Sequence, residues 1–509
     1  MKLVAKTIDL KIKGEDIILS EETATRLGVS SGDRVNLTSK GKTISTFIGV
    51  SSTLVEDDEV GVLGDIKEDL KINEKEEIEV RPSKKPKSVS SIKNKVLGNK
   101  FTKEDLKTLV NDVVNEKLTN SEIAAYLTAI SINGMDLDET YWLTKSMVET
   151  GDQIDFEEFP IMDKHSIGGV PGNKISLLIV PIIAAAGLKI PKTSSRAITG
   201  AAGTADIMEV LAPVKFSAEQ IHKITNEVGG TLAWGGATNI APADDIFVRV
   251  EHPLSLDPRP QLLASVLSKK KAIGSDKIVI DIPTGDGTKV ENKEEAKKLA
   301  RDFIELGNRF EIEIESAITY GGTPIGHAIG PALEAQEGLM ALEGKKEAPK
   351  SLLEKSCSVA GILLEMGDKA DEEEGKKKAK KLLKNGKALE KFKEIIEVQG
   401  GDPQISSQDI ELGAFRKKLV APSSGYVTNV DNQGLIKIAR TLGAPADKGA
   451  GLRLYKKEGD EVEEGEKILE LFSEEKWKLK EAKKSIKKNF PLDVEGILLK
   501  RMPEFEDIQ

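Results

Sequence analysis

The sequence predicts a multidomain α/β protein, and three observations carry this prediction. The chain has 509 residues, which is too long for one hydrophobic core, because domains usually hold roughly 100 to 200 residues. An internal repeat lies within residues 1–80, whereas beyond Phe159 short apolar strands such as KIVIDIP alternate with Gly-rich turns and helices such as ENKEEAKKLARDFIELG. This alternation is typical of a mostly parallel sheet flanked by helices.

Composition shifts along the chain place the boundaries of four domains. We expect a small, β-rich, barrel-like N-terminal domain, a helical bundle, an α/β domain with a mostly parallel sheet that binds phosphate, and a C-terminal α+β domain with a hammerhead-like pattern. The predicted ranges are 1–84 for the barrel, 85–158 and 241–273 for the bundle, 159–240 and 274–415 for the α/β domain, and 416–503 for the C-terminal domain.

The two copies of the N-terminal repeat are residues 17–37 and residues 60–80, and each copy has the pattern of strand, short helix and strand. Two such units close naturally into a small barrel with pseudo-twofold symmetry. The repeat carries no cluster of His, Cys or carboxylates, so we interpret it as an assembly domain of a homo-oligomer, at least a dimer. The superposition aligns Leu27 with Leu70, Val29 with Ile72 and Val35 with Ile78.

Helical patterns dominate the next part of the chain. The stretch RPSKKPKSVSSIKNK at residues 81–95 lacks apolar periodicity and predicts a linker. From Thr102 to Val148 the segments FTKEDLKTLVNDVVNE and TNSEIAAYLTAI each open on a capping residue followed by an acid, which predicts a small helical bundle. Further on, residues 371–397 predict a charged helix pair broken at Asn385 and Gly386, and from Leu419 short strands return.

Composition excludes several classes of protein. With 39% hydrophobic and 31% charged residues the chain is globular, and a net charge of −10 argues against a nucleic-acid partner. The single cysteine, Cys357, excludes an internal disulfide and fits a reducing compartment. The longest apolar run, from Ile175 to Leu188, is shorter than the ~20 residues of a membrane span. We therefore expect a soluble, cytoplasmic protein that binds no membrane.

The segment PIMDKHSIGGVPGNKIS has the pattern of an anion site. A short strand runs into a Gly-rich turn and then into a long buried helix starting near Lys174. Gly168 and Gly169 let backbone N–H groups approach an oxyanion, and Lys164 and Ser166 add a cation and a hydroxyl. The alternative is a tight turn with a surface lysine.

Three further segments offer ligand groups. SSRAITGAAGTAD, at residues 194–206, is either a second anion loop or an ordinary connection between a strand and a helix. VEHPLSLDPRPQLLASVLSKKKA places Asp257, Ser265 and Lys269 around one helix, although the run Lys269 to Lys271 is also the pattern of a solvated helix end. IVIDIPTGDGTKV offers Lys289 after a buried strand, at a sheet edge where ligands of open α/β sheets bind.

Taken together, these motifs resemble the thymidine and pyrimidine-nucleoside phosphorylase family. The matching segments include GMDLDETYWLTKSMVETGD, DKHSIGG, SSRAIT with AGTAD, ASVLSKK, FKEIIEVQGGDP and the long run that begins GYVTNVDNQGLIKIARTLG, and they cover residues 95–503 in the family's order. The barrel-like extension and the divergent VPGNK resemble the archaeal-type AMP phosphorylase branch of this family. The resemblance implies a pentosyltransferase that converts AMP and phosphate into adenine and ribose 1,5-bisphosphate, with CMP and UMP as possible further substrates.

The resemblance also assigns roles to individual residues. It implies substrate contacts, a proton donor, inorganic-phosphate contacts and one residue near the base, with neither a cofactor nor a metal. One departure is that the branch commonly has Ser-Pro where this chain has Gly200-Ala201, so a hydroxyl contact is lost. The implied proton donor is Asp257. Lys164, His165 and Ser166 are implied to bind inorganic phosphate, and Lys269 to lie near the base. The implied substrate-binding residues are Gly169, Ser195, Arg196, Ala197, Ile198, Thr199, Gly200, Thr204, Ser265 and Lys289.

Alternatives to this function remain open at the level of sequence. A pyrimidine-nucleoside phosphorylase would accept substrates that lack a 5'-phosphate. A phosphoribosyltransferase would need a pyrophosphate donor and Mg2+, but no acidic pair stands beside the Gly-rich loop. The segments SSGYVTNV and GDEVEEGEKILEL also resemble the halves of a biotinyl or lipoyl carrier, yet no MKM or DKA motif connects them.

Overall fold

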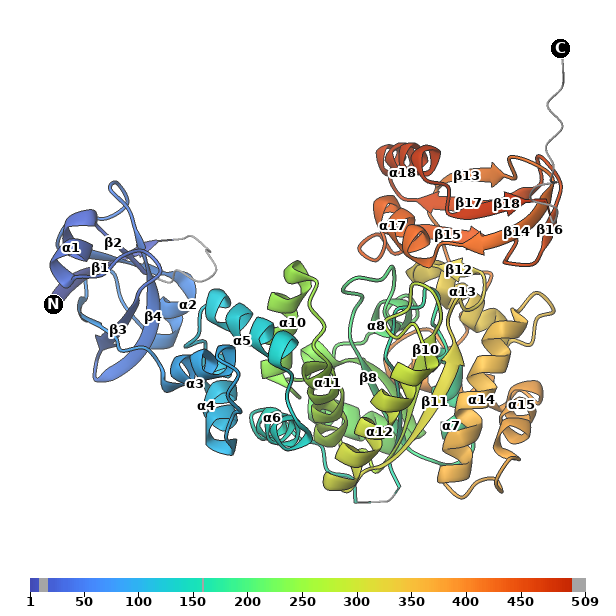
Figure 1. Ribbon diagram of the computed structural model, residues 1–509, viewed down its shortest axis with the longest axis horizontal. Coiled ribbons are helices and arrows are strands. Elements are labelled where there is room, and N and C mark those ends of the chain that lie inside the picture. The colour runs from blue at the N-terminus through green and yellow to red at the C-terminus, as the bar shows by residue number, and fades with distance from the viewer. Residues whose placement is uncertain (9–16, 158–159, 497–509) are drawn as a thin grey trace, which may run out of the picture. The chain divides into compact units, whose positions relative to one another are not determined.

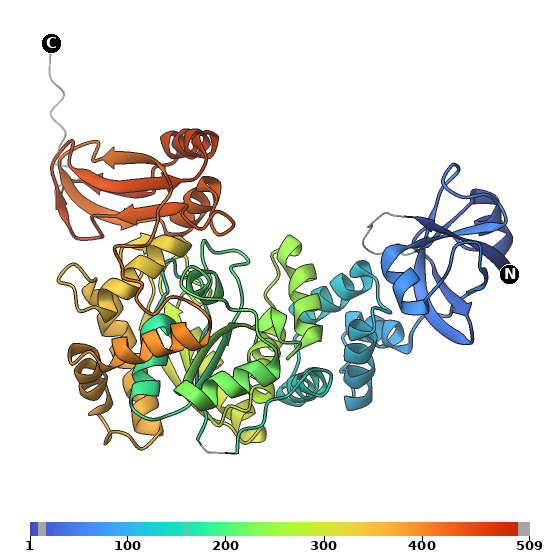
Figure 2. The same cartoon turned by 180° about the vertical axis from the view of Figure 1, so that it is seen from behind.

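The computed structural model describes residues 1–8, 17–157 and 160–496, and the chain forms two compact units (Figure 1). The first unit comprises Met1–Ser146 and Ala243–Pro260, and the second comprises Met147–Pro242 and Gln261–Gln509. Figure 2 shows the same elements from behind. Within the described part of the chain, no helix is long and apolar enough to cross a membrane.

The first unit begins with a closed six-stranded barrel in the order β1-β5-β2-β4-β3-β6. The two copies of the repeat correspond to β2-α1-β3 and β5-α2-β6, so the predicted duplicated unit and barrel are confirmed. Val35 and Ile78, which the superposition places in equivalent strands, are both fully buried in the barrel core. The elements are β1 (Lys2–Ile8), β2 (Ile17–Leu19), α1 (Glu21–Leu27), β3 (Arg34–Ser39), β4 (Lys42–Val50), β5 (Glu59–Leu63), α2 (Gly64–Leu70) and β6 (Glu77–Pro82).

The linker predicted at residues 81–95 is wrong over most of its length, because β6 ends at Pro82 and helix α3 occupies Lys87–Val96. The buried face of this helix is mostly polar, with Ile92 as its one buried apolar side chain, so apolar periodicity is weak. Ser88 Oγ donates to Asp112 Oδ2 at 2.7 Å, Ser91 Oγ donates to Asp105 Oδ1 at 2.5 Å, and Lys95 pairs with Glu139 at 2.7 Å. These partners lie on the following helices of the bundle.

The bundle helices begin where the capping signals place them. Thr102 and Thr119 each form a capping box with the acid three residues later, Asp105 and Glu122. Each box satisfies two backbone donors that would otherwise lack partners at the helix start. The bundle contains α4 (Lys103–Val114), α5 (Asn120–Asn133), α6 (Leu137–Glu149) and α10 (Pro242–Leu254).

The second unit contains the parallel sheet that the sequence predicts. Strands β11-β10-β7 and β8-β9 pair in parallel, and a parallel bridge between Ile161 and Lys189 places β8 beside β7. The apolar helix α7 is buried against this sheet, in a core that also contains Cys357. The strands are β7 (Met162–Ser166), β8 (Ile190–Ser194), β9 (Gly230–Trp234), β10 (Lys277–Thr284) and β11 (Glu313–Tyr320).

Helices cover the sheet and include the pair predicted at residues 371–397, which is interrupted by Asn385 and Gly386 as expected. Gly386 adopts φ +81°, a left-handed conformation that glycine reaches without strain. The helices are α7 (Ser176–Ala185), α8 (Thr204–Met208), α9 (Ala218–Val228), η1 (Gly235–Ala237), α11 (Arg259–Ala272), α12 (Lys293–Arg309), α13 (Pro331–Leu342), α14 (Lys350–Met366), α15 (Gly375–Lys384) and α16 (Lys387–Val398).

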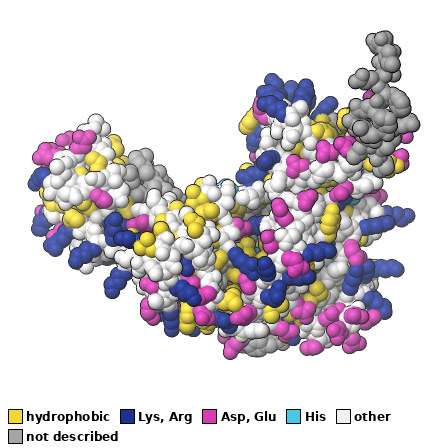
Figure 3. Space-filling view, in the orientation of Figure 1, with side chains coloured by type: hydrophobic (Ala, Val, Ile, Leu, Met, Phe, Trp, Pro, Cys, Tyr) yellow, Lys and Arg dark blue, Asp and Glu magenta, His cyan; other side chains and the backbone are white. Residues whose placement is uncertain are grey.

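The C-terminal part of the second unit is α+β, as predicted, and has two antiparallel sheets in the orders β12-β15-β17-β13 and β16-β14-β18. Strand β12 (Ala328–Ile329) comes from the segment assigned by sequence to the α/β domain, so this sheet is completed across the predicted boundary. Lysines gather over α18 in the space-filling view, whereas elsewhere on that face both signs of charge are interspersed (Figure 3). The remaining elements are β13 (Phe415–Val420), β14 (Gly425–Val430), α17 (Asn432–Leu442), β15 (Gly451–Leu454), β16 (Glu461–Val462), β17 (Lys467–Ser473), α18 (Lys476–Lys488) and β18 (Leu492–Glu495).

Candidate active site

The carboxyl ends of β7, β8 and β10 bring polar residues together at one edge of the parallel sheet. Lys164, His165 and Ser166 form the last three positions of β7, Lys192 lies in the middle of β8, and Asp281 lies on β10 in register with Ser166. In open α/β sheets this edge is where ligands bind. The residues predicted to bind phosphate therefore lie at the edge where ligands of open α/β sheets usually bind.

Lysines gather at this edge, and Lys164, Lys192 and Lys270 among them are buried. We define the lysine cluster as Lys164, Lys192, Lys269, Lys270 and Lys355 together with Asp163 and Asp281. Lys270 pairs with Asp163 at 2.6 Å, and Lys355 pairs with Asp281 at 3.0 Å. The ammonium of Lys192 donates to the carbonyl of Thr193. The lysines of this cluster are crowded around two carboxylates, so a bound anion would stabilise their charged forms.

The electrostatics of the cluster follow from burial and crowding of like charges. Burial lowers the pKa of Lys164 to about 8, although Asp281 acts to raise it. Burial, followed by the charge of Lys270, lowers the pKa of Lys192 well below its usual range. Burial and the surrounding lysines also hold the pKa of His165 well below its ordinary value, so this imidazole is neutral near pH 7. A bound phosphate would favour the charged forms of these lysines.

Asp281 organises the cluster from the central strand β10. Burial acts to raise its pKa, but the charges of Lys355 and Lys164 and two hydroxyl donors outweigh burial and lower it. The two hydroxyls are Thr319 Oγ1 at 2.5 Å and Ser166 Oγ at 2.8 Å. Asp281 is thus an ionised anchor that orients Ser166, and sequence reasoning missed it because an isolated Asp inside an apolar strand has no motif.

The first Gly-rich turn meets the loop that carries Lys289. Gly168 and Gly169 have φ of +90° and +86°, a region that favours glycine. A Cβ atom on Gly169 would lie 2.7 Å from the backbone nitrogen of Lys289, whereas the space beside Gly168 is open. Two segments that the sequence separates by more than a hundred residues are therefore packed backbone to backbone.

The second predicted loop, residues 195–204, connects β8 to α8. Its tip is accessible, because Ser195, Ile198 and Thr199 are exposed. Arg196, in contrast, is half-buried and held in place: its guanidinium pairs with Glu209 and, at 3.1 Å, with Asp206. Its side chain therefore anchors the loop.

The start of α8 completes this loop. Gly203 is its N-cap, and the side chain of Asp206 accepts hydrogen bonds from the nitrogens of Gly203 at 3.0 Å and Ala197 at 2.7 Å. A Cβ at Gly203 would lie 2.6 Å from the carbonyl oxygen of Ser195. Thr204, the first helical residue, is thereby held beside the loop whose residues were predicted to bind substrate with it.

Helix α11 joins Ser265 and Lys269, whose side chains lie one turn apart with Lys269 Nζ 3.3 Å from Ser265 Oγ. The alternative of a solvated helix end at Lys269 to Lys271 is wrong. Lys270 is buried in its ion pair with Asp163, and Lys271 donates to the carbonyl of Phe310 at 2.9 Å. Lys269 and Lys270 therefore belong to the lysine cluster, whereas Lys271 does not.

Asp257 lies in the first compact unit, on the connection between α10 and α11, and its side chain is exposed. Helix α11 begins at Arg259, so Asp257 stands two positions before the first helical residue. The other residues with predicted roles belong to the second unit. Its role as proton donor stays a prediction.

Lys174 is a buried residue whose role the sequence did not reveal. Its ammonium, fully buried, contacts the carbonyl oxygens of Ile325 at 2.9 Å and Ala328 at 3.2 Å and pairs with Glu337 at 2.5 Å. These contacts fix the chain between the Gly-rich turn and α7. The ammonium of Lys174 is therefore satisfied within the protein, so this lysine has a structural role next to the Gly-rich turn.

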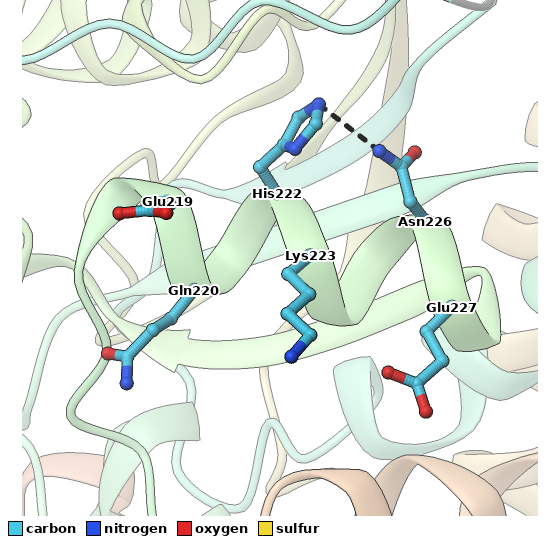
Figure 4. Close-up of a pocket in the computed structure, with 6 residues that line it drawn as sticks. All are labelled: Glu219, Gln220, His222, Lys223, Asn226 and Glu227. Carbon is cyan, nitrogen blue, oxygen red and sulfur yellow. Dashed lines mark hydrogen bonds between the residues drawn. The ribbon is translucent and has the colours of Figure 1, made fainter.

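A surface depression of about 820 Å³ runs along α9 (Figure 4). All six residues that line it lie on this one helix, and the side chain of His222 is hydrogen-bonded to Asn226 at 3.1 Å. None of the predicted site residues lines it. Among the residues described here, no group of three or more His, Cys, Asp or Glu side chains could hold a metal ion.

The fold and the site together define a glycosyl transferase. Residues 158–389 match the glycosyl transferase family a/b domain, residues 89–151 match the helical bundle domain of that family, and residues 426–493 match the pyrimidine nucleoside phosphorylase C-terminal domain. Among solved structures, anthranilate phosphoribosyltransferase from Thermus thermophilus is similar in fold, with a TM-score of 0.52, 18% identity, and coverage of 61% of this chain and 99% of the other. The enzyme from Saccharomyces cerevisiae, in complex with PRPP and Mg, gives a TM-score of 0.50 at 16% identity, covering 62% and 98%.

Curated relatives narrow this class further. AMP phosphorylase from Methanococcoides burtonii is 51% identical over 508 residues, which cover 100% of both chains. AMP phosphorylase from Methanosarcina barkeri is 51% identical over 99% of both chains, and AMP phosphorylase 1 from Archaeoglobus fulgidus is 49% identical over 95% of both. The chain belongs to the AMP phosphorylase family.

Proposed function

We propose that this chain uses inorganic phosphate to cleave AMP, which yields adenine and ribose 1,5-bisphosphate. The observation that carries the proposal is the lysine cluster, in which lysines outnumber carboxylates beside the parallel sheet whose strands β7 and β8 lead into the two Gly-rich loops. Such an excess is costly to bury unless an anion compensates it. Family membership over the full chain supports the same reaction.

The reaction places two demands on such a site. Phosphorolysis passes through a sugar with oxocarbenium character, so phosphate must be held close to C1' and the 5'-phosphate must be held rigidly. Lys164, neutral His165 and Ser166 on β7 are suited to hold inorganic phosphate. The loop at 195–200, with Thr204, offers the second set of donors.

The leaving base gains negative charge and needs a proton or a cation. We assign the proton to Asp257, while Ser265 and Lys269, joined on α11, lie on the base side. Gly169 and Lys289, whose backbones touch, complete the pocket around the ribose and its phosphate. The reaction as proposed uses phosphate as its nucleophile and calls for no cofactor or metal, and excess EDTA should leave the rate unchanged.

Phosphorus NMR with AMP and phosphate supplied together tests the proposal directly. Consumption of both signals and growth of two new monoester signals of ribose 1,5-bisphosphate, with adenine detected by chromatography, supports it. Base release at an equal rate in phosphate-free buffer would show a hydrolase instead. CMP and UMP in parallel reactions determine the base preference.

The match of residues 426–493 to the pyrimidine nucleoside phosphorylase C-terminal domain favours one second candidate, a nucleoside phosphorylase. Uridine and thymidine, assayed beside AMP, separate the two, because only a nucleoside phosphorylase turns them over without a 5'-phosphate. A carrier function has less support. Helix α17 occupies the connection between the two halves of the C-terminal part, and Lys448 in that connection is paired with Glu209 at 2.8 Å.

The assembly and location of the protein complete the proposal. We propose a homo-oligomer, at least a dimer, formed through the barrel, which closes on itself and holds none of the predicted site residues. Light scattering of the full chain measures the particle mass, and a monomer would contradict this. The one cysteine, Cys357, is a buried thiol in the core, which fits a cytoplasmic location.

A further inference from the structure

Helix α17 of the C-terminal part touches both loops to which substrate binding was assigned. At its last turn, Nη1 of Arg440 donates to the carbonyl oxygens of Ile198 and Gly200, at 3.0 Å each. Both carbonyls belong to the loop at residues 195–200. Arg440 is otherwise an exposed side chain on the helix surface, so these two bonds account for its orientation.

The other end of α17 holds the loop that leads to Lys289. Asn432, which is buried, donates through Nδ2 to the carbonyl oxygens of Gly321 and Gly322 at 3.1 Å each. Gln433 donates through Nε2 to the carbonyl oxygen of Gly287 at 2.8 Å. The two glycine segments are packed together, since a Cβ at Gly285 would lie 2.7 Å from the nitrogen of Gly322.

The helix between these contacts is rigidly seated. Its apolar face, with Leu435, Ile438 and Leu442, is buried in the core of the C-terminal part. Its first turn is capped by Asp431, whose carboxylate accepts from the nitrogen of Gly434 at 2.9 Å. At about 1.5 Å per residue, Asn432 and Arg440 stand roughly 12 Å apart along the axis. The helix thus fixes the distance between two loops that do not follow each other in sequence.

The bonds from Arg440 also determine which groups the loop presents elsewhere. In a planar trans peptide the carbonyl oxygen and the following N–H point in opposite directions. Because the carbonyls of Ile198 and Gly200 face Arg440, the N–H groups of Thr199 and Ala201 point away from it. Two backbone donors on the far side of the loop are the kind of groups that bind a phosphate oxyanion.

We propose that α17 is a positioning element for nucleotide binding and that Arg440 is its key positioning residue, which orients the N–H groups of Thr199 and Ala201 toward the 5'-phosphate. This inference rests on the proposed function for the identity of the ligand. It gives the C-terminal part a role in the site although that part supplies no residue to the chemistry. Arg440 acts through the loop and does not contact the substrate.

Point variants of the full chain test this inference, because β12 pairs with β15 and removal of the C-terminal part would break a sheet. Arg440→Ala should raise KM for AMP about tenfold, the scale of losing hydrogen bonds from a charged donor, with kcat changed less than threefold. KM for phosphate should stay within twofold. Arg440→Lys, which keeps a cationic donor, should recover most of the affinity. Lys437→Ala, an exposed change on the same helix, is the matched control.

Hydrogen exchange supplies a readout that does not depend on substrate identity. Arg440→Ala should speed amide exchange within residues 195–203, while Gln433→Ala should speed it within residues 285–289 and leave 195–203 unchanged. An Arg440→Ala protein with parental KM for AMP and parental exchange would overturn the inference. If the parent does not cleave AMP, the proposed function fails, and the exchange experiment alone decides whether α17 restrains the loops.

Discussion

Lys192 is the residue at which the charge argument can be tested most directly. It is buried, only 4% exposed, and among the described residues we find no carboxylate that pairs with it; its ammonium donates to the neighbouring carbonyl of Thr193. Lys192→Met keeps the length of the side chain and removes the charge. If Lys192 binds a phosphate oxygen, the variant loses a charged hydrogen bond.

A hydrogen bond that involves a charged group contributes about 1.5 to 3 kcal/mol, which corresponds to a factor of roughly 10 to 150 in affinity. No large discount for solvent screening applies, because the group is buried. KM for one of the two phosphate-bearing substrates should therefore rise by this factor, and the substrate affected identifies which phosphate Lys192 contacts. Steady-state kinetics with AMP and phosphate varied in turn measure both values.

Stability should change in the opposite direction. Burial and the charge of Lys270 disfavour the charged form of Lys192 in the ligand-free protein, so replacement by Met should leave the melting temperature equal or higher. A ligand present at 100 times its Kd stabilises a protein by about 2.7 kcal/mol. For the substrate that contacts Lys192, the variant should show little of this ligand-induced rise in melting temperature. Lys189→Met, at the residue directly before β8, is the control. Unchanged KM values for both substrates, or a lower melting temperature without ligand, would refute the reasoning.

Three further predictions concern single carboxyl or ammonium groups. Asp257→Asn should lower kcat by roughly 10² to 10⁴ at similar KM, whereas near-parental turnover would leave only a structural role at the start of α11. The kcat/KM for phosphate should fall as pH rises through about 8, since Lys164, with a pKa of about 8, then loses the proton that attracts the anion; a profile flat to pH 9.5 would contradict this. Burial raises the pKa of Glu334 to about 7 in the folded protein. Between its ordinary pKa and about 7 this carboxyl is ionised in the unfolded chain but protonated in the folded protein, so the free energy of unfolding falls as the pH rises. Glu334→Gln should therefore gain melting temperature over the parent at pH 8 but not at pH 5, as calorimetry can measure.

Two errors of sequence reasoning have the same physical origin. Helix α3 was assigned to a linker because its buried face is mostly polar: Ser88, Ser91 and Lys95 have partners on α4 and α6 that only the fold reveals. The lysines that end α11 were weighed as a solvated helix end, although Lys270 is buried against Asp163. In both cases a polar side chain is buried because a partner distant in sequence satisfies it, and no local pattern reveals such a partner.

The sequence by itself determined the elements that depend on local chemistry. Residues a few positions apart are enough to predict these elements: the repeat units of the barrel, the capping boxes at Thr102 and Thr119, and the Gly-rich turn at Gly168 and Gly169. Long motifs in family order also indicated the reaction, and they are the basis for the predicted ligand residues. Each of these signals comes from residues close together in sequence or from similarity to a family, so it can be recognised without the tertiary structure.

Only the tertiary structure decided which of these segments share a site. It brought Lys192 and Asp281 to the sheet edge with Lys164, placed Gly169 against the backbone of Lys289, and set Arg440 of α17 on the loop at residues 195–200. The physical reason is that strand order, the burial of charge and contacts across more than a hundred residues depend on the packing of the whole second unit. The local sequence around a lysine in a strand is the same whether the lysine is solvated or buried beside other lysines. Only the tertiary structure shows that neighbouring lysines and burial disfavour its charged form, which a bound anion would stabilise.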